Sequence, residues 1–407
     1  MGEHYLTQEH RALRATVRDF AEREVGPRVR EMESARTVAV ELTRLIADQR
    51  LIGATIPRAY GGMGTGHLAK TVIIEELSRV SAAMGAMVQA SQLGTAPLCL
   101  FGSTEQKKTW LPAIASGDCL PTIAVTEPDS GGHVLGMTST ADRDDDEWVL
   151  NGGKTYVGNS HVGNLHTVVA RTGPGSQGLS AFLVEADRPG CSLIEQQPTM
   201  GLHGFSFGEL RFENCRIPAA HMLGTEGDGL AVAYASSVLY GRPNLAAVAL
   251  GIHQATVETT AAFCAQRHRY GAPLADLGSV KLQLGQMTSR LMTAQLTAYH
   301  AVHLLDGGQP CDEWLINSKL VNTEYARASA HDAMNIHGAA ALGTDLPIER
   351  YRRDAEHIFA PAGTSDIQRL RLAEATLGTT KGSWSDKLAD RVRPETAPAN
   401  ARPQPRS

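Results

Sequence analysis

The sequence is poor in the features that mark metal, disulfide and membrane proteins. Only six of its 407 residues are cysteines, and only 5% are aromatic. The cysteines are scattered, with neither a CxxC pair nor a nearby histidine cluster, which disfavours both a metal site and a disulfide framework. They are Cys99, Cys119, Cys191, Cys215, Cys264 and Cys311. We therefore expect a protein of the reducing cytoplasm that holds no metal.

Long apolar runs and an excess of positive charge are also missing. No run approaches the roughly 18 apolar residues of a membrane-spanning helix. The first ten residues, MGEHYLTQEH, have no apolar signal core. The net charge is -5 and the pI is near 6.3, whereas nucleic acids and anionic membranes favour basic partners. With 42% hydrophobic residues, the chain is expected to be a soluble protein of two or three packed subdomains.

Changes of periodicity divide the chain into four parts. Apolar residues recur at steps of three and four over residues 1–121 and again over 226–380, which predicts two helical domains, the second a helix bundle. Residues 122–225 form a series of short β-rich runs, which predicts a small β-barrel or sandwich. Residues 381–407 end in a run rich in Pro, Ala and Arg and are expected to be disordered. The predicted fold is mainly α with a central β domain.

Local patterns predict individual elements. Ser103 or Thr104 is suited to cap a helix, and the β-rich runs on either side of Asn151-Gly152-Gly153 in WVLNGGKTYV predict a hairpin there. An apolar stripe with steps of three and four predicts one long helix of the bundle. It comprises Val280, Leu284, Met287, Leu291, Ala294, Ala298, Val302 and Leu305.

The late segment RRDAEHIFAPAGTSDIQRL, residues 352–370, carries the first chemical signal. A small apolar run is broken at Gly363, and Thr364 or Ser365 can cap the helix that follows, whose free N–H groups suit a polar or anionic ligand. The segment resembles the active-site loop of the acyl-CoA dehydrogenase superfamily, whose members use FAD to desaturate acyl thioesters. In that family a Glu directly before Gly-Thr-Ser removes the α-proton of the substrate. Here this residue is Ala362.

Two further segments resemble the flavin-binding strands of that family. AVTEPDSGGHVLG, residues 124–136, is similar to its TEPxxGSD signature, in which small residues let backbone N–H groups approach phosphate. The resemblance implies FAD contacts from Val125, Thr126, Gly131 and Gly132. Gly132 stands where the family has Ser.

KTYVGNS, residues 154–160, resembles the strand that lies over the flavin and implies contacts from Tyr156, Val157 and Gly158. Tyr156 replaces a Trp and remains an aromatic plate. Gly158 falls where a hydroxyl usually faces flavin N5, so this donor is lost, and we expect space to open beside N5. The alternative is that Gly158 marks a simple strand bulge.

YGRPNLAAVALG, residues 240–251, resembles the family helix that begins near the acyl chain. It implies Tyr240 and Arg242, together with Ala362, as substrate contacts. Isovaleryl-type members carry the catalytic base on this helix, directly before the Arg, where this chain has Gly241. Both usual positions of the base are therefore empty, and the catalytic base is unknown.

The remaining FAD contacts fall in two later segments. Residues 266–287, QRHRYGAPLADLGSVKLQLGQM, resemble the R-x-x-F-G motif, with Arg267 as the Arg and Tyr270 as the aromatic residue. In the family this Arg reaches the FAD of a neighbouring subunit. The resemblance thus implies a homo-oligomer, a dimer or tetramer. MNIHGAAALGTDLPIERYRRDA, residues 334–355, resembles the Q-x-x-G-G-x-G platform for the FAD diphosphate. It implies Asn335, Gly338 and Ala339, to which the late loop adds Thr364 and Asp366.

Three hypotheses follow for the function. The first is an FAD-dependent oxidoreductase that acts on an acyl thioester of CoA or a carrier protein, with electron-transfer flavoprotein as a possible partner. Its base is relocated or dispensable; Tyr240 would need a lowered pKa, and His203 or His337 has a suitable one. The second is a flavin-dependent oxygenase or oxidase, with which an opened N5 environment is compatible. The third is a non-catalytic or FAD-binding subunit of a hetero-oligomer, or a binding protein, in which a partner carries the base. We favour the first because most of the flavin-facing framework is kept.

Overall fold

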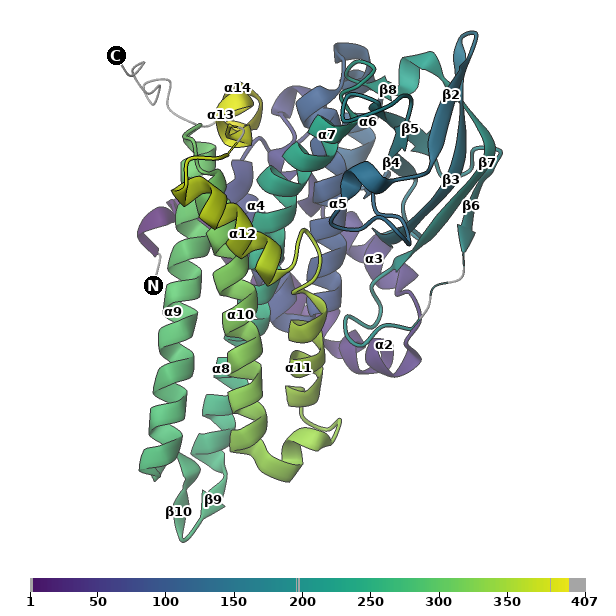
Figure 1. Ribbon diagram of the computed structural model, residues 1–407. Coiled ribbons are helices and arrows are strands. Elements are labelled where there is room, and N and C mark those ends of the chain that lie inside the picture. The colour runs from purple at the N-terminus through teal and green to yellow at the C-terminus, as the bar shows by residue number, and fades with distance from the viewer. Residues whose placement is uncertain (1–2, 195, 197, 381, 395–407) are drawn as a thin grey trace.

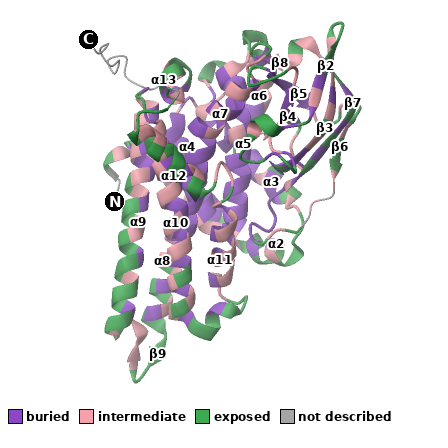
Figure 2. Ribbon diagram, viewed as in Figure 1, coloured by how far each residue is buried: buried purple, intermediate pink, exposed green. Residues whose placement is uncertain are grey.

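The structure is a computed structural model that describes residues 3–194, 196, 198–380 and 382–394. Long helices run the length of the molecule, and a twisted sheet lies at one side of them (Figure 1). The N-terminal helices are α1 (Gln8–Phe20), α2 (Val29–Ala35), α3 (Val40–Ala47), α4 (Gly66–Val80), α5 (Ala82–Phe101) and α6 (Thr104–Ser116). Helices α4 and α5 are buried along almost their whole length (Figure 2). They form the centre on which the other parts pack.

The central region forms an eight-stranded sheet in the order β6-β7-β3-β2-β4-β5-β8, with β1 paired to β4. The strands are β1 (Pro121–Ala124), β2 (Thr140–Asp144), β3 (Glu147–Gly158), β4 (Leu165–Arg171), β5 (Leu179–Glu185), β6 (Cys191–Ile194), β7 (Phe207–Pro218) and β8 (Met222–Leu223). Neighbours are antiparallel except that β1 and β2 pair with β4 in parallel. Trp148, Phe182 and Phe212 lie in the apolar core of this sheet. The predicted central β domain is confirmed.

The C-terminal region is a bundle in which α8 packs against α4 and α10. Its helices are α7 (Gly229–Ser236), the π-helical turn η8 (Ser237–Gly241), α8 (Arg242–Gln266), α9 (Gly278–Asp306), α10 (Asp312–His337), α11 (Ile348–His357) and α12 (Ser365–Thr376). A small hairpin of β9 (His268–Arg269) and β10 (Ala272–Pro273) joins α8 to α9. Among the described residues, no helix is both long and apolar enough to cross a membrane.

Several predicted elements are confirmed. The apolar stripe lies on α9, where Met287, Ala294 and Val302 are buried. Ser103 is the N-cap of α6, and its hydroxyl and the side chain of Gln106 form a reciprocal capping box. Helix α12 begins after Thr364, although the Thr364 hydroxyl makes no capping hydrogen bond.

The predicted hairpin at Asn151-Gly152-Gly153 was wrong. Strand β3 runs through these residues without turning, and its pairing with β7 shifts register between Leu150 and Gly152. A Cβ on Gly152 would lie 2.4 Å from the Ser139 hydroxyl, and its φ is +132°. Glycine is therefore required for a bulge and a close approach, which a one-dimensional pattern does not distinguish from a turn. The hairpin turn lies earlier, where Asp145 follows β2.

The expectation of disorder from residue 381 was wrong for residues 382–394, and residues 395–407 lie outside the described part. The described stretch contains α13 (Trp384–Lys387) and α14 (Ala389–Val392). The Asp312 carboxylate accepts hydrogen bonds from the backbone N–H groups of Trp384 and Ser385, at 2.8 and 2.9 Å. Trp384 and Val392 also join an apolar cluster with Tyr240 of η8. This stretch is held in place because Asp312 accepts hydrogen bonds from backbone N–H groups at the start of α13, which have no partner within that helix.

Candidate active site

The loop after β1 is anchored by one buried carboxylate. Glu127 accepts hydrogen bonds from the N–H of Thr138 at 2.6 Å and from the N–H of Ser139 at 3.0 Å. It also pairs with the buried Lys154 of β3 at 2.7 Å. Burial alone would raise the pKa of Glu127, but Lys154 and these donors outweigh it and lower the pKa to about 2. The loop that carries the TEP sequence is thereby fixed to the strand that carries Tyr156.

The tip of that loop leaves room for a ligand. A Cβ on Gly131 or Gly132 would have nothing within 4 Å, and both residues are exposed. The carbonyl of Thr126 accepts a hydrogen bond from Thr155 at 2.9 Å, whereas its hydroxyl has no partner among the described residues. Neither glycine is thus demanded by packing within the chain. Open backbone and an unused hydroxyl are what a phosphate-bearing flavin needs here.

The end of β3 presents an aromatic ring. Tyr156 has a φ of +57° and is 65% exposed, and its ring centroid lies 5.6 Å from that of Phe207. Val157 points the other way, into the core of the sheet. A large aromatic side chain held out in a left-handed backbone conformation is a conspicuous surface for stacking. These features fit a flavin ring at this strand.

Gly158 does not open space, contrary to our expectation. A Cβ on Gly158 would lie 3.0 Å from Ala90 Cβ and 3.1 Å from Phe205 Cζ. The tip of the Phe205 ring therefore occupies the place toward which a larger side chain at residue 158 would point. The missing hydroxyl is replaced by an apolar ring edge.

The loop that carries Phe205 is held from several sides. The N–H of Leu202 donates to the Asp354 carboxylate of α11 at 2.7 Å, and Gln196 donates to the Phe205 carbonyl at 3.0 Å. The Asn159 N–H donates to the Ser206 carbonyl at 2.7 Å. We did not identify Phe205 or Asp354 from the sequence, because only the folded chain brings them to the end of β3. The unusual Gly158 was the one available signal.

The two usual positions of the catalytic base meet in space. Gly241 ends η8, and a Cβ placed on it would lie 3.5 Å from Ala362 Cβ and 3.7 Å from Leu93 Cδ1. Ala362 has a φ of +55°. Its carbonyl accepts a hydrogen bond from Gln368 at 2.9 Å, and the next carbonyl, that of Gly363, accepts one from Lys319 at 2.7 Å. The loop is thus fixed, and the groups nearest the meeting point are Ala362, Leu93 and, at 3.8 Å, the Ser237 hydroxyl, none of which is a carboxylate.

The structure offers no support for the three candidate bases. The Tyr240 ring is buried beneath Lys70, whose Nζ lies 4.2 Å from its centroid, and burial raises the Tyr240 pKa further. His203 contacts the Thr199 carbonyl at 3.1 Å and Glu33 at 3.2 Å. His337 contacts the Ala333 carbonyl at 2.8 Å. The hydrogen bonds of both histidines and the ring contact of Tyr240 thus involve neither Gly241 nor Ala362.

The residues assigned to FAD fall into two groups at different ends of the molecule. Arg267 and Tyr270 lie at the β9–β10 hairpin, where Tyr270 is 94% exposed, at the opposite end of α9 from the C-terminal helices α13 and α14 (Figure 1). Asn335, Gly338 and Ala339 are exposed at the end of α10. The 29 residues of α9 span roughly 43 Å at 1.5 Å per residue. The hairpin is thus far from the sheet within one chain.

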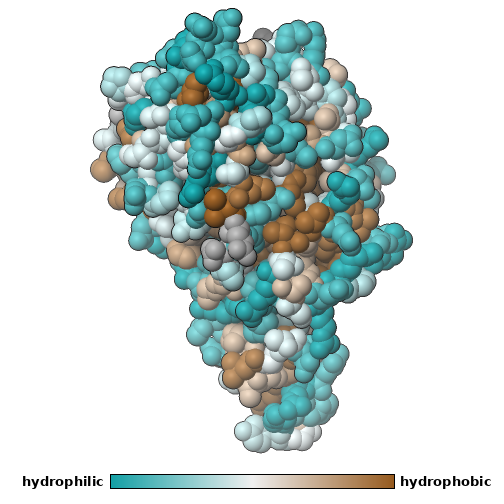
Figure 3. All heavy atoms as spheres, turned by 90° about the vertical axis from the view of Figure 1, so that its right-hand side faces the viewer, coloured by the Kyte–Doolittle hydropathy of each residue, from teal (hydrophilic) through white to brown (hydrophobic). Residues whose placement is uncertain are grey.

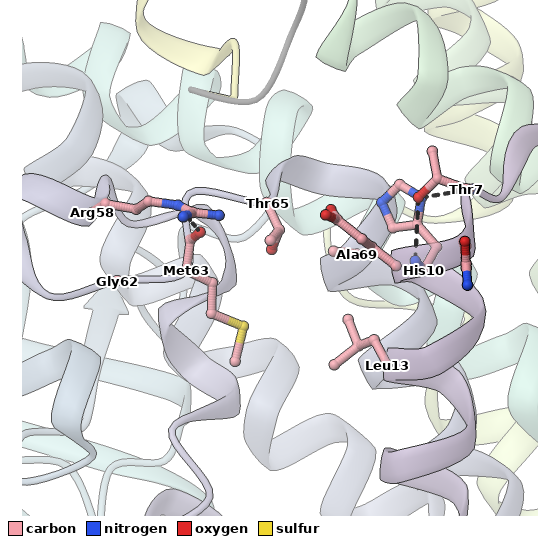
Figure 4. A pocket seen from close by; sticks show the side chains of 10 residues that line it. Thr7, His10, Leu13, Arg58, Gly62, Met63, Thr65 and Ala69 are labelled. Carbon is pink, nitrogen blue, oxygen red and sulfur yellow. Dashed lines mark hydrogen bonds between the residues drawn. The ribbon is translucent and has the colours of Figure 1, made fainter.

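One large cleft in the surface contains none of the predicted site residues. A cleft of about 730 Å³ lies between the start of α1 and the loop before α4, and Figure 4 shows Thr7, His10 and Leu13 on one side of it and Arg58 and Met63 on the other. Hydrophobic residues gather on the side of the molecule shown in Figure 3. Exposed apolar side chains of the sheet region include Leu193 and Met200.

Comparison with known proteins identifies the family to which this fold belongs. The acyl-CoA dehydrogenase N-terminal, middle and C-terminal domains match residues 7–118, 122–215 and 227–377. An acyl-CoA dehydrogenase of Bacillus subtilis (strain 168) is 35% identical over 379 residues, 92% of this chain and 100% of that protein. The human mitochondrial short-chain specific acyl-CoA dehydrogenase is 34% identical over 371 residues, 90% of each chain. The chain belongs to the acyl-CoA dehydrogenase family.

Solved structures agree. The glutaryl-coenzyme A dehydrogenase glutaryl-CoA complex matches with a TM-score of 0.89 and 30% identity, over 93% of this chain and 97% of that one. The FAD complex of PigA matches with a TM-score of 0.87 and 27% identity, over 92% and 98%. The prolyl acyl carrier protein oxidase AnaB matches with a TM-score of 0.86 and 28% identity, over 91% and 99%.

The contact between Gly158 and Phe205 predicts a strong coupling between substitutions. Gly158→Thr alone overpacks the site and is expected to cost about 1–3 kcal/mol, and Phe205→Ala alone to cost about 3–5 kcal/mol. The double variant should recover part of this loss, with a coupling of at least ~1 kcal/mol in unfolding experiments. Gly153→Thr is the matched control, because its Cβ would contact only the Leu210 carbonyl, at 3.5 Å. Simple additivity of Gly158→Thr and Phe205→Ala would contradict the contact.

The low pKa of Glu127 predicts how its contribution depends on pH. Its folded pKa of about 2 lies below the ordinary value of about 4.3. The stabilisation is therefore fully present above about pH 4.3 and is lost as the pH falls towards 2. Melting temperatures of wild type and Glu127→Gln should differ most at pH 7, differ by less at pH 3, and converge only as the pH approaches 2. A difference that stays constant with pH would show that the charge is not what stabilises the loop.

Proposed function

We propose that the protein is an FAD-dependent oxidoreductase that removes hydrogen from the α,β-bond of an acyl thioester, with no side-chain base at either usual position. The second part is carried by the packing of Gly241 against Ala362: an ideal Cβ built on Gly241 would lie 3.5 Å from the Cβ of Ala362. The exposed Tyr156 plate, the unused Thr126 hydroxyl and the open Gly131–Gly132 backbone support the first part. FAD, when bound, would supply the hydride acceptor.

The side chains of this chain would orient and enclose the reactants. Phe205 and Ala90 would exclude water at Gly158, where they leave no room for it. Lys319 and Gln368 would hold the carbonyls of the loop around Ala362. The oxygenase alternative loses its supporting observation, because the space expected beside Gly158 is filled. A carrier-protein thioester is as suitable a substrate as a CoA thioester, given the similarity to AnaB.

The separation of the two FAD groups supports an oligomer. One chain offers Thr126 and Tyr156 at the sheet, and we propose that the β9–β10 hairpin of a second copy brings Arg267 to the same FAD. A homodimer is the smallest assembly that completes the site, and a tetramer can contain two such pairs. Electron-transfer flavoprotein is the proposed oxidant of the reduced enzyme. The six free cysteines suit the cytoplasm as the location.

Absorbance spectroscopy tests the proposal directly. The purified protein is expected to be yellow, or to become so with added FAD, and to bleach anaerobically when its acyl thioester is added. A preparation that stays colourless with FAD would contradict the proposal and favour a non-catalytic subunit. Bleaching only by a reduced nicotinamide or flavin, followed by rapid oxygen uptake, would favour the oxygenase instead.

A restored base should raise the activity. Ala362→Glu places a carboxylate where the family's base stands, and positioned general-base catalysis contributes about 10²–10⁴-fold. We expect faster desaturation of simple acyl-CoAs by Ala362→Glu but not by Ala362→Gln, which is similar in shape and is no base. The measurement is the rate of anaerobic flavin bleaching in a stopped-flow instrument. Equal rates for the two variants would mean that the α-carbon does not lie at Ala362.

A further inference from the structure

Two basic side chains lie near the place where Gly241 and Ala362 meet, and neither of these two small residues carries a carboxylate. Arg242 follows Gly241 directly, and Lys319 lies against the loop of Ala362, with Nζ 2.7 Å from the Gly363 carbonyl. Arg242 in turn lies near enough to lower the pKa of Lys319, after burial the second cause of that shift. The two positions that hold the carboxylate in related enzymes are Gly and Ala here.

Arg242 is a buried cation that has no hydrogen-bond or ion-pair partner in the described part of the chain. The residue is 6% exposed, and its guanidinium makes no hydrogen bond or ion pair with the described residues. Its Nε is buried and unsatisfied. Lys319 differs, because two backbone carbonyls accept its hydrogen bonds. A buried charge is costly unless it is paired, so the site around Arg242 favours an anion.

The nearby charges of the chain do not fill this role. Asp312 is the acidic group that favours the charged form of Arg242, but its carboxylate already accepts four hydrogen bonds from the C-terminal segment, from residues 383–385. Arg371 adds further positive charge. The described residues thus provide no hydrogen-bond or ion-pair partner for Arg242, and we expect an anion that pairs with it to come from a bound molecule.

We propose that the acyl group of the substrate carries a carboxylate on its α-carbon, and that this carboxylate pairs with Arg242 beside Gly241 and Ala362. We place the carboxylate on the α-carbon because, in the proposed function, both empty base positions face that carbon. The inference therefore rests on the proposed function. Guanidinium and carboxylate match in shape and charge.

Such a substrate needs no base. The bond between the α-carbon and its carboxylate breaks and CO₂ leaves, so that the bonding electron pair stays on the α-carbon. This pair forms the α,β-double bond as a hydride leaves the β-carbon for the flavin, which is reduced by two electrons. The negative charge of the carboxylate ends on the reduced flavin, and no proton is removed from carbon. The reaction is a decarboxylating dehydrogenation of a malonyl-type thioester.

Binding is tested with a pair of thioesters that cannot be dehydrogenated. Malonyl and acetyl thioesters lack a β-hydrogen and differ only by the carboxylate. Titration calorimetry on the FAD-loaded protein, with each acyl group on CoA and on a carrier protein, is expected to show malonyl bound at least tenfold more tightly. Arg242→Gln should abolish this preference, and Arg242→Lys should keep part of it if the Gln variant does not fold. Arg371→Gln should preserve the preference for malonyl, because Arg371 is an exposed residue that adds positive charge near Arg242.

Turnover is tested with ethylmalonyl and butyryl thioesters, which again differ by one carboxylate. Ethylmalonyl is expected to bleach the flavin anaerobically at least a hundredfold faster, with one ¹³CO₂ released per flavin from a labelled carboxylate. Equal bleaching by butyryl, reduction without CO₂, or equal binding of malonyl and acetyl would each overturn the inference. Butyryl turnover would leave the proposed function standing. If no thioester binds or reduces the flavin, both fail.

Discussion

One buried hydrogen bond joins the parts of the candidate site. The Asp354 carboxylate of α11 accepts the N–H of Leu202 at 2.7 Å, which fixes the loop between β6 and β7 to the helix that leads into Ala362. The approach is close, because a Cβ on Gly201 would lie 2.5 Å from the Arg353 carbonyl. Burial raises the pKa of Asp354 to about 7. The same short helix thus sets both the loop of the missing base and the ring that faces Gly158.

This arrangement changes how the substitutions in the chain are understood. Taken one at a time, Gly158 lacks the usual hydroxyl, and Gly241 and Ala362 each lack the carboxylate of a base. In the structure Gly158 is matched by Phe205, and Gly241 and Ala362 face each other. Unfilled space in a packed interior is destabilising. A small residue that contacts a large neighbour, or another small residue, therefore indicates that the site has been repacked as a whole. The chain has kept its family's frame and changed the groups at its centre.

The sequence was sufficient for the fold where a pattern is local. The stripe on α9 and the Ser103 cap depend on residues within a few turns of each other, and both were predicted. Gly152 was misassigned because a bulge and a hairpin share the same local signal, and only the contact with Ser139, from another strand, separates them. Residues 382–394 were misassigned because their helices depend on Asp312, some seventy residues away.

The same distinction applies to the site. Motif positions such as Thr126 and Ala362 could be proposed from resemblance, since each belongs to a short contiguous segment. Phe205 could not, because its role exists only through contact with a residue 47 positions earlier in the chain. The lack of a partner for Arg242 among the described residues likewise follows only from its surroundings in the folded chain. Contacts between distant residues, and charges left without partners, are properties of the folded chain.

The short helices at the C-terminal end have a consequence for how the protein is made. Trp384 and Val392 pack with Tyr240, which directly precedes Gly241. The apolar support of the η8 turn therefore leaves the ribosome after the sheet and after helices α4 and α5. A nascent chain that has already formed its sheet and helices α4 and α5 therefore still lacks the apolar residues that pack against Tyr240.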